Sequence, residues 1–321
     1  MDLIGRRVFI TGGAGFIGSH VARRLADRNR ITLYDNFHRD AFSGSALARH
    51  PRVRVIRGDV RDATRLRRAV KGHDTFLHMA SIAGVDMVRS RPVETMLVNI
   101  LGTHHLLEAI RANRLRAHRV VDFSTSEVFG THVYHAEEQS ATTLGEVGEA
   151  RWTYAVSKLA AEHLAHHYGR EYGIPVASIR PFNVYGPGQV GVGAIHQFIV
   201  RAIRHAPLIL RGDGSQIRSW CYIDDMVDGI LRVLTRPAAV GKVFNIGNPR
   251  ATVTIAALAE KIIQLTGSTS GVRYDRRRYV DVELRIPGID RARRLLGFEP
   301  KVGLDEGLLR TIAWYQERER G

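Results

Sequence analysis

A glycine-rich turn between a short apolar run and a helix-forming pattern constrains this chain more than any other feature. The turn, TGGAGFIG, covers residues 11–18, and the apolar run covers residues 7–10. A turn of this kind brings backbone N–H groups and the positive end of a helix against a pyrophosphate. The next apolar run, residues 31–34, ends at Asp35, about 23 residues beyond Gly12, where a carboxylate can accept a hydrogen bond from a ribose 2′-OH. The sequence therefore predicts dinucleotide binding, and the negative charge of Asp35 favours NAD over NADP.

Composition indicates an ordinary globular protein. The 321 residues are 44% hydrophobic and 25% charged, which allows two domains or one large α/β unit. Cys221 is the single cysteine, so an internal disulfide is excluded and a reducing, cytoplasmic location is expected. The sequence contains no apolar run near the roughly 18 residues of a membrane helix, so we expect no membrane association.

The formal net charge of +15 comes mostly from arginine. The basic residues are dispersed and no RNA-binding signature with interleaved aromatic residues accompanies them, so we expect no nucleic-acid partner. The adjacent histidines His104–His105 and His166–His167 face different directions on helices, and no cluster with metal-ligand spacing occurs. We therefore expect no metal site. Steering of an anionic small substrate is a by-product of the positive charge.

Strand and helix patterns alternate over the first 180 residues. This alternation predicts an α/β fold, a Rossmann-type doubly wound parallel sheet with ligands at the carboxyl ends of the strands. The predicted strands cover residues 7–10, 31–34, 53–56, 75–79, 119–123 and 176–179, and the long predicted helices cover about 92–112 and 153–172.

The alternation ends after Arg180, and the remainder predicts a second unit. We expect an NAD-binding domain of residues 1–180 plus about 220–250. Residues 181–219 and 251–321 are expected to form a smaller, discontinuous C-terminal substrate-binding domain of short helices and loops. The polar segment 137–151 is predicted to be a loop over the site.

Tyr154 and Lys158 lie four residues apart and therefore on one face of a helix. A tyrosine ionises near pH 10, and a neighbouring cation is expected to lower its pKa toward neutrality, which makes the phenol a usable general base. A predicted strand also ends at Ser124–Ser126. Together with the dinucleotide motif of residues 11–18, the Tyr154/Lys158 pair and this strand end resemble the catalytic set of the short-chain dehydrogenases/reductases.

These motifs resemble those of the extended short-chain dehydrogenases/reductases of the NAD-dependent epimerase/dehydratase family, which act on nucleotide sugars. The resemblance covers nearly the whole chain, through the segments Thr11–Gly18, Asp59–Val60, Ser124–Gly130, Tyr154–Lys158, Arg180–Pro187, Arg218–Asp225 and Leu296–Pro300. It implies NAD as the cofactor, a nucleotide-diphosphate sugar (UDP-sugar favoured) as the substrate, and a homodimer. The helices at about 92–112 and 153–172 would form the four-helix bundle of that dimer.

The resemblance also implies roles by position. Tyr154 would take the proton of the sugar 4-OH with help from Thr125, while Lys158 would hold the nicotinamide ribose. The implied catalytic residues are Thr125, Ser126, Glu127, Tyr154 and Lys158. The implied NAD-binding residues are Gly12, Gly15, Phe16, Ile17, Gly18, Asp35, Asn36, Asp59, Val60, Ala80, Ser81, Asn99, Tyr154 and Lys158. The implied substrate-binding residues are Asn183, Arg218 and Arg285.

Residues 125–127, Thr-Ser-Glu, bear on the reaction. This triplet resembles UDP-glucuronate decarboxylases and also GDP-mannose 4,6-dehydratases, and the Arg-Pro-Phe-Asn segment at residues 180–183 favours the decarboxylases. A serine at position 126 removes the acid that dTDP-glucose dehydratases carry there. In contrast, decarboxylases and uronate epimerases often have arginine directly after Tyr-Gly-Pro, where this chain has Gly188. A decarboxylase is the leading interpretation, and a nucleotide-sugar 4-epimerase or 4,6-dehydratase stays open. A non-catalytic NAD-sensing or RNA-associated module is a remote alternative. Such a module would not need the Thr125, Tyr154 and Lys158 set, which is intact in this chain.

Overall fold

A seven-stranded parallel sheet forms the larger part of the molecule. The computed structural model describes residues 3–191, 193–276 and 279–320. The sheet has the strand order β12-β7-β5-β4-β1-β2-β3. Its strands are β1 (Arg7–Thr11), β2 (Arg30–Asp35), β3 (Val53–Arg57), β4 (Thr75–His78), β5 (Arg119–Phe123), β7 (Val176–Pro181) and β12 (Val243–Ile246). The order reverses between β1 and β4, which is the topology of a Rossmann-type doubly wound sheet and confirms the predicted fold class.

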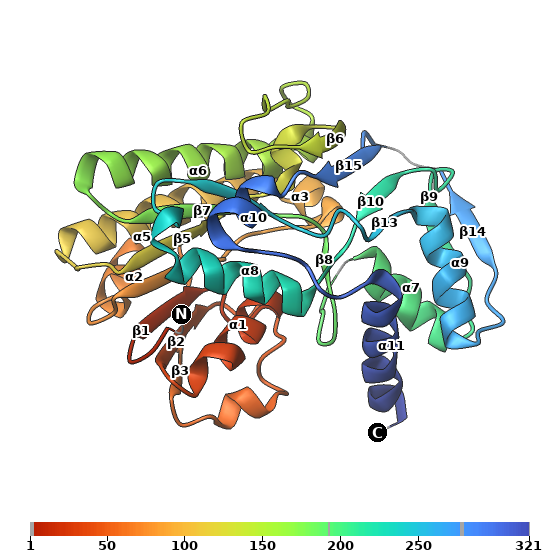
Figure 1. Cartoon of the computed structure of the whole chain (residues 1–321), viewed down its shortest axis with the longest axis horizontal. Coiled ribbons are helices and arrows are strands. Elements are labelled where there is room, and N and C mark those ends of the chain that lie inside the picture. Colours follow the sequence, from red (N-terminus) through yellow and green to blue (C-terminus); the bar gives the residue numbers. More distant parts are fainter. Residues whose placement is uncertain (1–2, 192, 277–278, 321) are drawn as a thin grey trace.

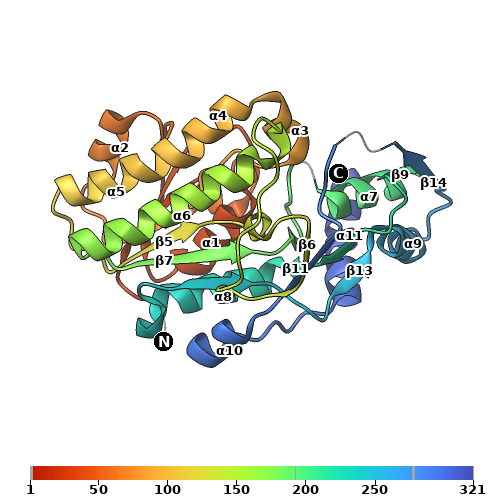
Figure 2. The same cartoon turned by 90° about the horizontal axis from the view of Figure 1, so that it is seen from above.

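Helices cover both faces of this sheet (Figures 1 and 2). One face carries α1 (Phe16–Ala26), α8 (Ile223–Thr235) and α10 (Asp290–Leu296). The opposite face carries α2 (Ala63–Ala69), α5 (Gly102–Ala112) and α6 (Thr153–Tyr172). Successive side chains of a strand point to opposite faces, so Val8 and Ile10 join the core under α1 and α8, while Phe9 joins the core under α2 and α5.

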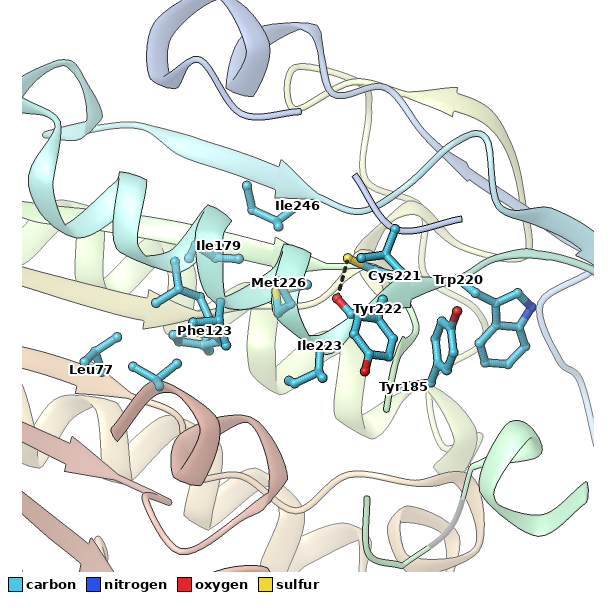
Figure 3. Packing of buried hydrophobic residues seen from close by; sticks show 14 of the residues in the cluster. Leu77, Phe123, Ile179, Tyr185, Trp220, Cys221, Tyr222, Ile223, Met226 and Ile246 are labelled. Carbon is cyan, nitrogen blue, oxygen red and sulfur yellow. Dashed lines mark hydrogen bonds between the residues drawn. The ribbon is translucent and has the colours of Figure 1, made fainter. Parts of the chain in front are cut away.

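The core under α8 extends from the sheet toward the C-terminal part of the chain. Figure 3 shows Leu77, Phe123, Ile179 and Ile246 from four strands of the sheet packed near Met226 of α8. The same cluster continues through the short parallel pair β8 (Val184–Tyr185) and β11 (Cys221–Tyr222). This continuous apolar cluster fixes the strands of the sheet relative to the segments that follow residue 180.

The predicted helix at about 92–112 is interrupted. It consists of α4 (Pro92–Met96), the π-helical segment η2 (Leu97–Leu101) and α5, and it follows the short helix α3 (Val85–Ser90). In a π-helical segment the backbone hydrogen bonds run from i to i+5, which widens one turn. The widened turn carries Asn99, whose side chain is fully buried.

Beyond the sheet, the C-terminal part contains more regular structure than the sequence predicted. Helices α7 (Ala194–Ile203) and α9 (Ile255–Thr266) pack against each other, and the terminal helix α11 (Leu304–Arg320) has 17 residues. The expectation of short helices and loops was therefore wrong here. The buried residues Leu308, Ile312 and Tyr315 recur at helical spacing along α11, so the pattern was present but diluted by charged residues.

Short strands complete this part of the molecule. Four of them form a second sheet: β13 (Thr252–Thr254), β10 (Ile217–Ser219), β15 (Leu284–Pro287) and β6 (His132–Ala136). A further pair consists of β9 (Leu208–Arg211) and β14 (Val272–Asp275). Short 3₁₀ segments occur elsewhere in the chain at η1 (Ala46–Arg49), η3 (Ser126–Phe129), η4 (Ala150–Trp152) and η5 (Pro237–Ala239). The sequence did not predict β6, because β6 is exposed along much of its length and pairs with the distant β15.

Figure 2 shows the strands of the large sheet pointing toward the part of the molecule that contains α7, α9 and α11. The carboxyl ends of these strands therefore face the second part of the chain, which is where a ligand binds in folds of this type. Among the helices of the described ranges, none combines the length and the apolar character needed to cross a membrane.

Candidate functional site

A cleft lies at the carboxyl ends of the strands and contains most residues that the sequence singled out. Of the predicted NAD-binding residues, its lining includes Gly12, Gly15, Phe16, Ile17, Gly18, Asp35, Asn36, Asp59, Val60, Ala80, Ser81, Tyr154 and Lys158. Thr125, Ser126, Glu127, Asn183 and Arg285 line the same cleft. Strand ends and loops separated by more than 250 residues of sequence thus meet in one place.

The glycine turn is shaped by close backbone approach. Gly12 has a φ of +68°, and a side chain there would place its Cβ 2.7 Å from the backbone nitrogen of Ala80. At Gly18 the Cβ would lie 2.7 Å from the carbonyl oxygen of Gly12. Helix α1 begins at Phe16 without a side-chain cap, so its first N–H groups stay available to an anion.

Asp35, at the end of β2, is tied to this turn. Its carboxylate accepts hydrogen bonds from the backbone N–H of Ala14 at 2.9 Å and of Phe37 at 2.8 Å. Burial raises the pKa of Asp35, and these backbone bonds act in the opposite direction. The carboxylate therefore both holds the turn against β2 and faces the cleft.

The far end of the NAD-binding half is formed by the loop after β3. Asp59 is ion-paired to Arg61 at 2.6 Å, and Arg61 also contacts Glu94 at 3.2 Å. The hydrogen bonds from Arg61 lower the pKa of Asp59. Val60 is buried beside it, while Asn36 is exposed at the cleft edge.

Asn99 lies behind the cleft lining rather than in it. Its Oδ1 accepts a hydrogen bond from Ser81 at 2.9 Å, and its Nδ2 donates to the Ser157 hydroxyl at 2.9 Å. Ser157 in turn donates to the backbone carbonyl of Tyr154 at 2.9 Å. Asn99 thus joins the loop after β4 to the helix that carries Tyr154, and it positions Ser81 at the cleft surface.

Tyr154, Thr125 and Ser81 converge at the centre of the cleft. Burial of the phenol raises the pKa of Tyr154 to about 12, and the charge of Glu127 acts in the same direction. Hydrogen bonds with Thr125 and Ser81 and the charge of Arg39 lower it. The prediction that Lys158 lowers this pKa was wrong, because burial dominates and the cation that acts on the phenol is Arg39.

Arg39 was not predicted from the sequence as a site residue. It comes from the loop after β2, lines the cleft, and donates a hydrogen bond from Nη2 to the carbonyl oxygen of Ala83 at 2.6 Å. The glycine- and strand-based patterns that revealed the rest of the cleft give no signal for it, since it belongs to no periodic element.

Lys158 lies at the base of the cleft and is 1% exposed. Its Nζ is buried and has no hydrogen-bond partner among the described residues. Burial lowers its pKa, while Asp122 and Glu162 act to raise it. A buried ammonium with unused donors requires a polar partner.

The residues of the cleft match the chemical groups of a dinucleotide. The close-packed glycine turn leaves room for a pyrophosphate next to backbone N–H groups, and the unused donors of Lys158 match a ribose diol. The carboxylate of Asp35, bonded to the turn through Ala14, and the loop of Asp59 line the same cleft. The cleft therefore fits NAD.

The wall opposite the glycine turn is a buried cluster of charges. Arg151, 3% exposed, contacts Glu127 at 2.5 Å and Asp281 at 3.2 Å. Arg218 contacts Asp281 at 3.6 Å, and Arg285 lies 3.9 Å from Glu127. Burial lowers the pKa of Arg151, but the ion pairs with Glu127 and Asp281 outweigh it and the pKa is raised.

The predicted substrate-binding residues differ in their access to the cleft. Arg285 lines it, whereas Arg218 is buried behind it and donates to the carbonyl oxygens of Val282 and Glu283. Asn183 lines the cleft and donates to the carbonyl oxygen of Ser219 at 3.1 Å. Sequence reasoning missed Arg151, whose sole signal was its position three residues before Tyr154 at the start of α6.

Burial lowers the pKa of Arg285 to about 10, and the charge of Glu127 acts against this. The guanidinium is therefore protonated at neutral pH. One hydrogen bond to the carbonyl oxygen of Gly130 at 3.3 Å holds it, and its Nε is buried without a partner among the described residues. Within the described ranges, no group of three or more histidine, cysteine or acidic residues is arranged to hold a metal ion.

The fold and the cleft define a nucleotide-binding enzyme of the short-chain dehydrogenase/reductase type. The model of the NAD dependent epimerase/dehydratase family matches residues 8–247. The chain belongs to this family, whose members depend on NAD.

Three relatives illustrate the similarity. The chain is 35% identical to UDP-glucuronic acid decarboxylase 3 of Arabidopsis thaliana, over 94% of this chain and 86% of that protein. It is 30% identical to UDP-N-acetyl-alpha-D-glucosaminuronate decarboxylase of Bacillus cytotoxicus, over 98% of this chain and 99% of that protein. Among solved structures, DesIV, a dTDP-glucose 4,6-dehydratase from Streptomyces venezuelae with NAD and TYD bound, is 31% identical and superposes with a TM-score of 0.89 over 98% of each chain.

Proposed function

We propose that this enzyme is an NAD-dependent UDP-glucuronate decarboxylase that works through transient oxidation of C4. The observation that carries the proposal is the buried, protonated Arg285 guanidinium in the same cleft as Thr125 and Tyr154. The similarity to two uronate decarboxylases over nearly the full chain supports the same reaction.

Uronate enzymes often have an arginine at the position that Gly188 occupies in this chain. Here Arg285 supplies a guanidinium group in the cleft. The charged cluster in the cleft wall contains three guanidinium groups and two carboxylates, Glu127 and Asp281. Glu127 is held by Arg151 at 2.5 Å and lies 3.9 Å from Arg285, so Arg285 keeps positive charge for another anion. Arginine binds carboxylates through two parallel hydrogen bonds, which matches the C6 carboxylate of a uronic acid.

Tyr154 and Thr125 would act on the 4-OH of the sugar, with Tyr154 taking its proton. Bound in this cleft, NAD⁺ would supply a reversible acceptor for the hydride of C4. The resulting 4-keto sugar carries its carboxylate β to the carbonyl and loses carbon dioxide readily. Arg285 would hold the sugar carboxylate, and Asn183 would hold the adjoining diphosphate. Ser126 and Glu127 would border the reacting carbons. Arg218 would stabilise this wall of the cleft from behind.

The cofactor would lie along the remaining lining of the cleft. The pyrophosphate would contact Gly12, Gly15, Phe16, Ile17 and Gly18, the adenosine ribose Asp35 and Asn36, and the adenine Asp59 and Val60. Ala80 and Ser81, positioned by Asn99, would border the nicotinamide, and Lys158 would hold its ribose. In this proposal, residues 1–180 plus about 220–250 form the NAD-binding domain. Residues 181–219 and 251–321 form the nucleotide-sugar-binding domain.

A 4-epimerase or a 4,6-dehydratase would use the same first oxidation. Incubation of the purified enzyme with NAD⁺ and a panel of UDP-, GDP- and dTDP-sugars, followed by mass spectrometry, separates the three reactions. We expect loss of carbon dioxide from UDP-glucuronate. Loss of water from a neutral sugar would identify a dehydratase, and a new isomer of unchanged mass would identify an epimerase.

We also propose a cytoplasmic homodimer. Exposed apolar side chains gather on α4, η2 and α6, which contact one another: Val93, Met96, Leu97, Leu101 and Val156. A second copy of the same face would bury them in the four-helix bundle expected for this family. Sedimentation of the wild type as a dimer, and of Leu97→Glu as a monomer, is the expected result.

A further inference from the structure

A second groove lies at the amino ends of the first strands of the large sheet. Figure 2 shows the strands pointing toward α7, α9 and α11, so their first residues lie at the opposite end of the sheet. The groove is lined by the starts of β1, β2 and β3 and by the turns that precede β1, β2, β3 and β4. It shares no described lining residue with the cleft. The groove is therefore separate from the site of the proposed reaction.

The groove concentrates positive charge that is dispersed in the sequence. Its described lining contains seven basic side chains: Arg6, Arg7, Arg28, Arg30, Arg52, Arg54 and Lys71. The one carboxylate in the same lining is Asp74, whose Oδ1 accepts a hydrogen bond from the Thr75 hydroxyl at 2.7 Å. The groove thus has a large excess of positive charge.

Most of these cations meet no carboxylate. Four of them are exposed and make no side-chain hydrogen bond or ion pair with another described residue: Arg7, Arg30, Arg54 and Lys71. Arg52 donates to the backbone carbonyl oxygen of Asp27 at 2.8 Å, and Arg6 contacts the His118 ring at 3.3 Å. The chain therefore leaves several guanidinium groups of one groove without a counter-charge.

Three of the unpaired arginines lie on the same face of the sheet. Arg7 and Arg30 are register partners on β1 and β2, and Arg54 of β3 is the partner of Thr32. Because side chains alternate between the two faces of a strand, Arg30 and Thr32 share a face with both partners. Like charges on directly opposed residues destabilise a sheet. This arrangement therefore has a cost in the absence of an anion.

Helix ends do not account for these arginines. Lys71 follows the end of α2, where a cation interacts favourably with the negative end of the helix dipole. Arg7, Arg30 and Arg54 lie on strands. A Cβ atom at Gly72 would lie 3.9 Å from Nη1 of Arg7, so this guanidinium lies beside the turn that carries Lys71. The charges of the strands and of the turn are therefore available together to an anion from solution.

The groove has no surface on which a nucleic-acid base can stack. The aromatic side chain of its described lining is His73, which packs edge-on against Phe9 at 5.1 Å. The two ring nitrogens of His73 are bonded to Val70 and Thr32, at 3.1 and 2.8 Å. Proteins that bind single-stranded nucleic acids add exposed aromatic side chains to a basic groove. Arginine by itself binds phosphate groups through two parallel hydrogen bonds.

We propose that this groove binds a chain of phosphates, either inorganic polyphosphate or the phosphate part of a nucleotide. Arg7, Arg30 and Arg54 bind the phosphate oxygens, and Lys71 adds a further positive charge beside Arg7. Several cations in one row match several linked phosphates, whereas a single monovalent anion leaves most of the repulsion in place. The proposal does not depend on the reaction in the cleft, so failure of the decarboxylase function leaves its expected results unchanged.

Isothermal titration calorimetry of the full-length protein with inorganic tripolyphosphate tests the proposal. NAD⁺ and UDP are present throughout to occupy the cleft, and the salt concentration is held at about 0.1 M because screening changes the affinity. We expect one site per chain with a Kd on the order of 10 µM. The double variant Arg30→Gln/Arg54→Gln should bind at least about 10-fold more weakly.

A matched control removes the same charge elsewhere. Arg170→Gln/Arg294→Gln replaces two exposed arginines that do not line the groove, and its affinity should stay within about twofold of the wild type. Without ligand, Arg30→Gln/Arg54→Gln should unfold at a higher urea concentration than the wild type, because it removes the repulsion with Arg7. This second measurement shows that a loss of binding does not come from a loss of folding.

The remaining outcomes identify the ligand or overturn the proposal. UTP that binds more tightly than tripolyphosphate, and loses this affinity in Arg30→Gln/Arg54→Gln, would assign the phosphates to a nucleotide; weaker or equal binding of UTP would assign them to an inorganic chain. No binding at about 100 times the expected Kd, or an equal loss in the control variant, would overturn the proposal. Tighter binding of a short single-stranded RNA would also overturn it, in favour of a nucleic-acid site.

Discussion

The two walls of the cleft are built in different ways. The wall that fits NAD comes from the ends of β1, β2 and β5 and from helix α6, and each of its motifs is continuous in the sequence: the glycine turn, Asp35, Ser124–Ser126 and the Tyr154–Lys158 pair. The opposite wall is a cluster of charges from separate segments, held together by Arg151 between Glu127 and Asp281. Backbone geometry therefore defines the cofactor wall, whereas buried ion pairs define the substrate wall.

The largest expected effect is on the cofactor wall. Tyr154→Phe should lower turnover at least about 1,000-fold, because the phenol oxygen is the proton acceptor for the 4-OH. The NAD content of the purified protein should be unchanged, since the glycine turn and Lys158 remain. Product formation by mass spectrometry and cofactor release on denaturation measure the two quantities. Tyr172→Phe, an exposed tyrosine of the same helix, is the control, and near-normal turnover of Tyr154→Phe would refute the assignment.

On the substrate wall, Arg151→Met should affect stability more than cofactor binding. Removing one partner of a buried ion pair costs about 3–5 kcal/mol of the free energy of unfolding, because the other charges stay buried. Glu127 and Asp281 would both lose their closest cation. Urea unfolding measures the change. Arg204→Ala, which removes the exposed pair with Glu319, should change it by less than about 1 kcal/mol. Equal effects of the two substitutions would contradict the role given to the buried cluster.

Arg285→Met sharpens the distinction within the substrate wall. A hydrogen bond to a charged group contributes about 1.5–3 kcal/mol, so the affinity for UDP-glucuronate should fall about 10- to 150-fold. The affinity for UDP, which lacks the carboxylate, should stay within about threefold. Isothermal titration calorimetry with both ligands measures the ratio. Equal losses of affinity for both ligands would indicate that Arg285 binds the diphosphate and not the sugar carboxylate.

Asp122→Asn tests the buried carboxyl group beneath the cofactor wall through the pH dependence of the free energy of unfolding. The pKa of Asp122 is raised from 3.8 to about 6 in the folded protein, so its contribution to stability is fully present below pH 3.8 and is lost as the pH rises through about 6. Relative to Asp122→Asn, the wild type should lose about 1.4 kcal/mol between pH 5 and pH 8. Urea unfolding at both pH values gives this difference. A difference that is independent of pH would show that the carboxyl group titrates normally.

The sequence predicted the features that depend on neighbouring residues and missed those that depend on distant ones. The parallel sheet, the cleft at its carboxyl ends and the glycine turn could be predicted because strand periodicity and turn chemistry are local properties. Strand β6 could not, because its partner β15 lies about 150 residues away and few of its own side chains are buried. Helix α11 was missed because charged residues dilute its apolar positions.

The same limit applies to the prediction of the site residues from the sequence. Asp35, Tyr154 and Lys158 were found from spacing and Thr125 from the end of a predicted strand and the family resemblance, and the structure brings all four into one cleft. Arg39 and Arg151 were not found, because a single arginine in a chain with 47 lysine and arginine residues is not distinctive, and the only signal for Arg151 was its place three residues before Tyr154. The pKa of Tyr154 was also beyond reach, since it depends on burial and on Glu127 and Arg39, which reach it from other elements.

The central claim is that C4 is oxidised and reduced again in one cleft while carbon dioxide is lost. Turnover of UDP-glucuronate carrying deuterium at C4 tests it most directly. We expect NAD⁺-dependent release of carbon dioxide and a UDP-pentose that retains the deuterium, because the same hydride returns to the same carbon. A product without carbon dioxide loss, or a pentose that has exchanged its deuterium with solvent, would contradict the account.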